Sequence, residues 1–148
     1  MTTQTDDIVR FYRDTVLHHA QSPHNQGTLE PSDRVASRHN ALCGDECSIF
    51  LRLAPEGCIS DARFTATGCA ISIASASIMT DLIRGRTIKD ASDLADEFTA
   101  YLEHGTAWTA PTTLAAIAEV RAYPARVRCA LLPWQALSEA LGQPRLGH

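Results

Sequence analysis

The chain has 148 residues, of which 45% are hydrophobic, and it carries a formal net charge of −4. This length and composition are typical of a globular domain with its own core, and we expect residues 1–148 to form a single domain. The acidic balance and the lack of a basic stripe argue against a nucleic-acid partner. No signal peptide and no bilayer-length apolar segment is visible, so we expect a cytoplasmic protein without a membrane partner.

The spacing of apolar residues predicts a helix, then strands, then further helices. Residues 7–21 carry apolar side chains at helical spacing, and the Pro and Gly residues that follow end this helix. Strands are expected over residues 34–40, 48–53 and 59–65. Four later helices are expected over residues 70–84, 87–102, 111–121 and 125–141. This order predicts an α+β fold in which a small three-stranded antiparallel sheet packs against several helices.

Three cysteines lie in contexts that favour a thiolate or a metal ligand. Cys43 lies in a glycine-containing loop, and the carboxylate of Asp45 follows two residues later. Cys69 opens a predicted helix, whose N-terminus carries partial positive charge, and Cys129 lies near the start of the last helix beside Arg128. Their wide separation favours one metal or sulfur site assembled from distant segments. Three thiolates and a carboxylate suit tetrahedral Zn²⁺, and they could equally hold an iron–sulfur cluster.

The sequence contexts of the two remaining cysteines and of four histidines indicate no chemical role. Cys47 lies on the apolar side of the strand that contains Ile49, so we expect it to fill the core. Cys58 follows a glycine in a hairpin turn, and we expect an exposed thiol there. Four histidines lack the spacing of metal ligands and are expected at the surface: His18, His19, His24 and His39.

With these motifs in order, the chain resembles the U-type iron–sulfur cluster assembly proteins, the group that includes NifU N-terminal, IscU and SufU proteins. The resemblance extends from about residue 12 to residue 141. It is carried by Ser22-Pro23-His24-Asn25-Gln26-Gly27, Cys43-Gly44-Asp45, Gly68-Cys69-Ala70-Ile71-Ser72 and Cys129-Ala130-Leu131.

Three features place the chain nearer to the SufU-like branch than to the IscU-like branch. IscU-like members have His just before the third cysteine, where this chain has Arg128. They also carry a Pro-Pro-Val-Lys motif upstream, where Tyr123-Pro124-Ala125-Arg126 stands here. The segment between Cys69 and Cys129 is longer than in IscU, as it is in SufU-like proteins.

The resemblance implies a SufE/NifU-like fold and a zinc-ligand set of Cys43, Asp45, Cys69 and Cys129. It implies a zinc-dependent sulfurtransferase for iron–sulfur cluster assembly. Such a protein takes persulfide sulfur from a SufS-like, pyridoxal-phosphate-dependent cysteine desulfurase and supplies downstream cluster-assembly proteins. In this branch a histidine of the desulfurase displaces one zinc ligand, so that Cys43 would accept the sulfur while Arg128 balances charge or orients a ligand.

Two other functions are compatible with the same residues. The first is a scaffold on which an iron–sulfur cluster is built by the same four side chains and then transferred. The second is a structural zinc module that serves only protein–protein contact.

Overall fold

A three-stranded antiparallel sheet forms one layer of the fold, with its strands in the order β1-β2-β3. The computed structural model describes residues 3–41 and 44–142. The strands are β1 (Arg34–Asn40), β2 (Asp45–Leu53) and β3 (Ile59–Thr67). Side chains along the first part of β2 alternate between buried and more exposed positions, so one face of this strand enters the core, as the apolar spacing predicted.

Strand β2 begins at Asp45, although the apolar pattern predicted its start at residue 48. Asp45 pairs with Asn40 of β1, and the next residue, Glu46, pairs with Thr67 of β3. Strand β2 is longer than predicted because both of its neighbouring strands continue to this end of the sheet and pair with it. Asp45, which we expected in a loop, is therefore held by the sheet.

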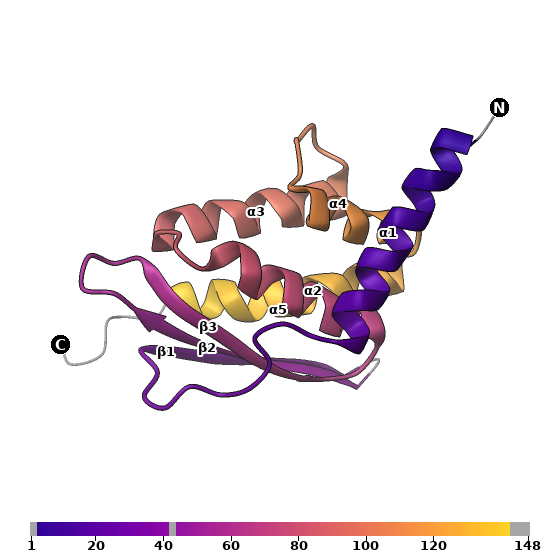
Figure 1. The fold of residues 1–148 in the computed structure, drawn as a ribbon. Helices are drawn as coiled ribbons and strands as arrows, with labels where there is room; N and C mark the ends of the chain where they lie inside the picture. Colours follow the sequence, from indigo (N-terminus) through magenta and orange to yellow (C-terminus); the bar gives the residue numbers. More distant parts are fainter. Residues whose placement is uncertain (1–2, 42–43, 143–148) are drawn as a thin grey trace.

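Helices cover one face of the sheet, which confirms the predicted α+β fold (Figure 1). Helices α2 and α5 pack on the sheet, α3 packs on α5, and α1 packs on α2. The predicted helix over residues 111–121 is a short α-helix followed by a 3₁₀ segment. The helical elements are α1 (Thr3–Gln21), α2 (Ala70–Ile83), α3 (Ile88–His104), α4 (Thr112–Ile117), η1 (Ala118–Ala122) and α5 (Pro124–Leu141). Within the described residues, no helix combines the length and the apolar character that crossing a membrane requires.

Small side chains on α2 let this helix lie close against α5. Ser75 is fully buried at this contact. Its hydroxyl donates to the carbonyl of Ala130 at 2.6 Å and accepts from the indole Nε1 of the buried Trp134 at 3.0 Å. Each of these buried polar groups therefore has a partner, and the pairing fixes α2 relative to α5. The N-terminal ends of both helices, which carry Cys69 and Cys129, are held together as a result.

Replacing Ser75 by Ala should destabilise the fold. The change leaves the Trp134 Nε1–H and the Ala130 carbonyl without this partner, which costs about 1–3 kcal/mol. The gain in helix propensity from Ser to Ala offsets about 0.5 kcal/mol of that loss. Ser138→Ala is the matched control, because Ser138 is an exposed residue of α5 and gains the same propensity. Urea unfolding should show a lower free energy of unfolding for Ser75→Ala alone; equal values for the two variants would contradict this account of the helix contact.

Candidate metal centre

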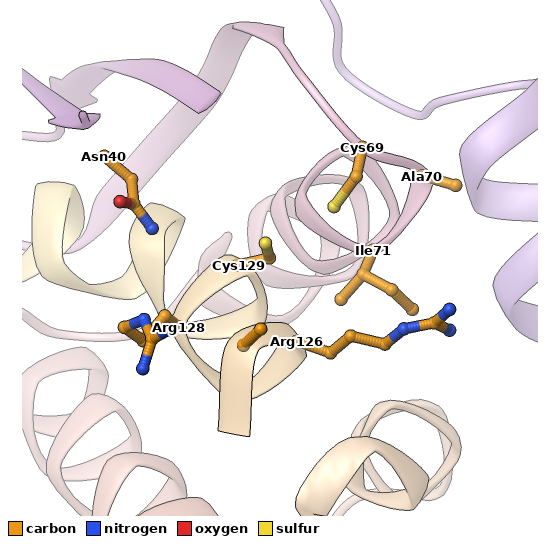
Figure 2. A pocket seen from close by; sticks show the side chains of 8 residues that line it. Asn40, Cys69, Ala70, Ile71, Arg126, Arg128 and Cys129 are labelled. Atoms are coloured by element: carbon orange, nitrogen blue, oxygen red, sulfur yellow. The ribbon is translucent and has the colours of Figure 1, made fainter. Parts of the chain in front are cut away.

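Asp45, Cys69 and Cys129 lie together at one end of the molecule. Each offers one ligand atom, and these three atoms all lie within 4.8 Å of one another. Asp45 comes from the first residue of β2, Cys69 is the N-cap of α2, and Cys129 lies in the second turn of α5. Figure 2 shows the sulfurs of Cys69 and Cys129 turned toward one another. Three of the four predicted ligands are therefore adjacent, and the fourth, Cys43, lies outside the described residues.

The carboxylate of Asp45 is bonded to the start of α2. The backbone N–H of Cys69 donates to Asp45 Oδ1 at 3.1 Å, and the Cys69 Sγ lies 3.6 Å from Oδ2. Helix α2 has no acidic residue in its first turn, and the Cys69 sulfur does not cap it. Asp45 therefore supplies the negative charge that the N-terminus of a helix favours, and it satisfies one of the first unpaired N–H groups of α2.

Ser72 is a part of this centre that the sequence did not reveal. Its hydroxyl lies 2.7 Å from Asp45 Oδ2, 3.0 Å from the Cys129 carbonyl oxygen and 3.8 Å from the Cys69 sulfur. Since a hydroxyl has one hydrogen, Ser72 donates to one of these oxygens at a time. Local sequence did not indicate these contacts, because they come from β2 and α5.

Pro133 explains why the carbonyl of Cys129 can accept a bond from another helix. In an α-helix the N–H four residues later normally donates to a carbonyl, and proline has no N–H to donate. Pro133 lies inside α5, four residues after Cys129. The Ser72 hydroxyl lies where it can donate to this carbonyl, and the interaction joins α2 to α5 beside the two cysteines.

Gly68 allows Asp45 to lie against the start of α2. Its φ is +136°, and a Cβ added to it would lie 2.1 Å from Asp45 Oδ1 and 2.5 Å from Asp45 Cγ. Both the backbone conformation and the close approach therefore require glycine at this position. The sequence shows a glycine directly before Cys69, but no local pattern indicates that Asp45 packs against it.

A cavity of about 350 Å³ adjoins the two cysteines. Cys69 is exposed, whereas Cys129 is buried with 7% of its surface accessible. The centre is thus reached from one side, and Arg126 and Arg128, both exposed, come from the start of α5 at this opening. Figure 2 shows both arginines among the residues that line the cavity, which are Asn40, Cys69, Ala70, Ile71, Ala125, Arg126, Arg128 and Cys129.

The spacing of the Cys69 and Asp45 donor atoms fits two ligands of one tetrahedral metal ion. Bonds of about 2.0–2.3 Å place two ligands of one such ion roughly 3.3–3.8 Å apart. The distance of 3.6 Å between Cys69 Sγ and Asp45 Oδ2 lies in this range. Thiolate and carboxylate groups of this kind can hold Zn²⁺, and thiolates are also the usual ligands of iron–sulfur clusters.

The two other cysteines lie away from this centre. Cys47 is fully buried in the core, as predicted, and burial raises its pKa to about 12, so it stays a thiol. Cys58 was predicted to be exposed and is only partly so. The prediction was wrong because the end of the hairpin packs on the start of α3, where Cys58 forms an isolated bridge with Thr87.

The prediction that four histidines lie at the surface holds for His18 and His39, which are exposed, but it was wrong for His19. His19 is buried, with 5% of its surface accessible, and its Nδ1 lies 2.7 Å from Ser77 Oγ. Burial lowers the pKa of His19, with a further contribution from His24. His19, His24 and Asp81 form a second group whose ligand atoms lie within 4.8 Å of one another. No spacing in the sequence shows this group, because α1, the segment after it and α2 each supply one member.

Comparison with known proteins identifies the family. The family model described as NifU-like N terminal domain matches residues 11–142 of the chain. The chain belongs to this family. The resemblance that the sequence motifs indicated is thereby confirmed, and the match includes every described residue of the candidate metal centre.

Individual relatives of this NifU-like chain are named either as a sulfurtransferase or as a scaffold protein. "Zinc-dependent sulfurtransferase SufU" of Bacillus subtilis is 33% identical over 141 residues, covering 93% of this chain and 94% of that protein. "Iron-sulfur cluster assembly scaffold protein IscU" of Thermotoga maritima is 32% identical over 133 residues, covering 88% and 92%. A crystal structure from Fervidobacterium islandicum, described as "Putative iron-sulfur cluster assembly scaffold protein for SUF system (FiSufU)", superposes with a TM-score of 0.80 at 29% identity, covering 86% of this NifU-like chain and 93% of that one.

Replacing Gly68 by Ala should weaken metal binding at this centre. The new Cβ displaces the Asp45 carboxylate, so the affinity for added Zn²⁺ should fall by at least about tenfold, as when a supporting contact of a metal site is lost. Gly57→Ala is the matched control, because Gly57 also has a positive φ, of +95°, but a Cβ there meets nothing within 4 Å. Zinc titration of both variants measures the difference. Equal zinc affinity in Gly68→Ala and Gly57→Ala would show that the contact with Asp45 does not support the site.

Proposed function

We propose that this protein is a zinc-dependent sulfurtransferase that accepts persulfide sulfur from a cysteine desulfurase for iron–sulfur cluster assembly. The observation that carries the proposal is the convergence of Asp45, Cys69 and Cys129 at an opening beside Arg128. A structural zinc site is closed by its ligands, whereas here Cys69 is exposed and a cavity adjoins it. The name of the Bacillus subtilis relative supports the same activity.

The proposed zinc ligands are Cys43, Asp45, Cys69 and Cys129. Cys43 precedes Asp45 by two residues, so covalent geometry alone keeps its Cα within about 7 Å of the Cα of Asp45. Cys43 is therefore close enough along the chain for us to propose it as the fourth ligand of the same ion. Bound zinc would keep the cysteines deprotonated at neutral pH and mask their nucleophilicity until a docked partner frees one of them.

Cys43 is the residue that we propose receives the sulfur. Its thiolate attacks the terminal sulfur of the persulfide on the desulfurase cysteine. A sulfur–sulfur bond forms on Cys43 while the sulfur–sulfur bond of the desulfurase persulfide breaks, and the desulfurase cysteine leaves as a thiolate. Cys69 and Asp45, joined by the hydrogen bond between the Cys69 N–H and Oδ1, keep the rest of the site in place during the transfer.

Arg128 serves the transfer through its charge. Zinc with three thiolates and one carboxylate carries a formal charge of +2 − 4 = −2, and the incoming persulfide adds further negative charge. Arg128 and Arg126 line the cavity that adjoins the cysteines. Their guanidinium groups reduce the repulsion between the site and the persulfide, since opposite charges attract at short range. The proposed partner is a SufS-like, pyridoxal-phosphate-dependent cysteine desulfurase, and downstream cluster-assembly proteins would take the sulfur.

A scaffold for an iron–sulfur cluster is the second candidate function, because the Thermotoga maritima relative carries that name. The same four side chains would hold the cluster. Arg128 weighs against it, since the position before the third cysteine then lacks the histidine that IscU-like scaffolds have.

Replacing Cys43 by Ala should abolish sulfur acceptance. In an assay with a SufS-like desulfurase and cysteine, stimulation of sulfide release and persulfide labelling of the chain should fall to the background of the desulfurase alone. Cys58→Ser is the control, because Cys58 is a partly exposed thiol at the far end of the hairpin and should leave both readouts unchanged. Sulfur acceptance at the wild-type level in Cys43→Ala would refute the proposed role of this cysteine.

A further inference from the structure

A second cluster of metal-ligating side chains lies where the C-terminal end of α1 meets α2. His18 and His19 occupy the last turn of α1, His24 follows in the next segment, and Asp81 lies on α2. Asp81 comes 12 residues after Cys69, which is roughly 18 Å along a helix with a rise of about 1.5 Å per residue. The cluster is therefore separate from the cysteine centre.

His24 is held in an orientation that suits metal binding. Its Nδ1 lies 2.6 Å from Asp81 Oδ2, and the other carboxylate oxygen, Oδ1, accepts from Asn25 Nδ2 at 2.8 Å. A carboxylate bonded to one ring nitrogen keeps the proton on that nitrogen and leaves a lone pair on the other, as around most metal-bound histidines. The lone pair of His24 then lies on Nε2.

The Nε2 of His24 faces a second imidazole nitrogen. It lies 3.0 Å from the Nε2 of His18. Two nitrogen ligands of one tetrahedral ion, with bonds of about 2.0–2.1 Å, lie roughly 3.3 Å apart. The separation of the two nitrogens is therefore within a few tenths of an ångström of this spacing, and a turn of the exposed His18 ring would direct its lone pair to a shared ion.

The buried side of the cluster is fixed by Ser77. Its hydroxyl pairs with His19 Nδ1 at 2.7 Å and accepts from the backbone N–H of His24 at 2.8 Å. The ring centroids of His19 and His24 lie 4.5 Å apart. The outer side is open, since the His24 and Asp81 side chains are 40% and 42% exposed, and an ion can reach the cluster together with water ligands.

We propose that this cluster binds one divalent transition-metal ion through the Nε2 atoms of His18 and His24, with Asp81 orienting His24 and His19 forming the buried wall. Imidazole ligands suit Zn²⁺, Ni²⁺ and Cu²⁺ and distinguish this site from the sulfur-rich centre at the other end of α2. A metal ion here would tie α1 to the segment after it, beside the helix that carries Cys69.

Zinc titration by calorimetry tests the site on the metal-free protein. We expect two equivalents of Zn²⁺ per chain in the wild type and one in His24→Gln or His18→Gln. Asp81→Asn should weaken the second equivalent by about 10–100-fold, as loss of an orienting carboxylate does. His104→Gln is the control, because His104 is an exposed histidine at the end of α3 and should retain both equivalents.

A double variant with Cys69→Ser and Cys129→Ser distinguishes zinc binding at the cysteine centre, the first equivalent, from zinc binding at the histidine cluster. It should lose the first equivalent and retain the one that depends on His24, and the histidine ring signals of residues 18 and 24 should shift in its NMR spectrum on adding Zn²⁺. A second equivalent that binds equally to wild type and His24→Gln, or ring signals that do not move, would overturn the proposal. Loss of the first equivalent alone bears on the cysteine centre and leaves the histidine site standing.

Discussion

The buried carboxylate of Asp45 is the constraint on which the candidate centre depends. A buried charge is costly unless it is paired or hydrogen-bonded. Asp45, with 2% of its surface accessible, meets the Cys69 N–H and the Ser72 hydroxyl. Asp45 is the first residue of the central strand β2, so these contacts tie this end of the sheet to the first turn of α2. Gly68 keeps the intervening turn free of a side chain that would occupy the same space.

From that carboxylate the polar contacts continue into α5. Ser72 contacts both Asp45 and the Cys129 carbonyl, and Pro133 leaves that carbonyl without its usual helical donor. Ser75 repeats the connection one turn later through Ala130 and Trp134. The sheet and the two cysteine-bearing helices thus form one connected unit, and the described residues of the candidate centre, Asp45, Cys69 and Cys129, belong to it.

Much of this arrangement could be predicted from the sequence, and the exceptions have a common physical cause. Alternation of apolar residues is a local property, so the strand through Ile49 and the core position of Cys47 were predicted correctly. The adjacency of Asp45, Cys69 and Cys129 was inferred from their local contexts. The role of Ser72 and the start of β2 depend on partners distant in the sequence, and no local pattern contains them. The same holds for His19 and His24, whose partners Ser77 and Asp81 lie on α2.

The most direct test of the central claim is metal analysis of protein purified without added metal, with wild type beside Cys129→Ser. If Asp45, Cys69 and Cys129 belong to a zinc centre for sulfur transfer, the wild type should carry one zinc per chain more than the variant and show no visible absorbance. Iron and sulfide in the wild type, with visible absorbance that Cys129→Ser lacks, would contradict this account and assign the centre to cluster assembly on the protein itself.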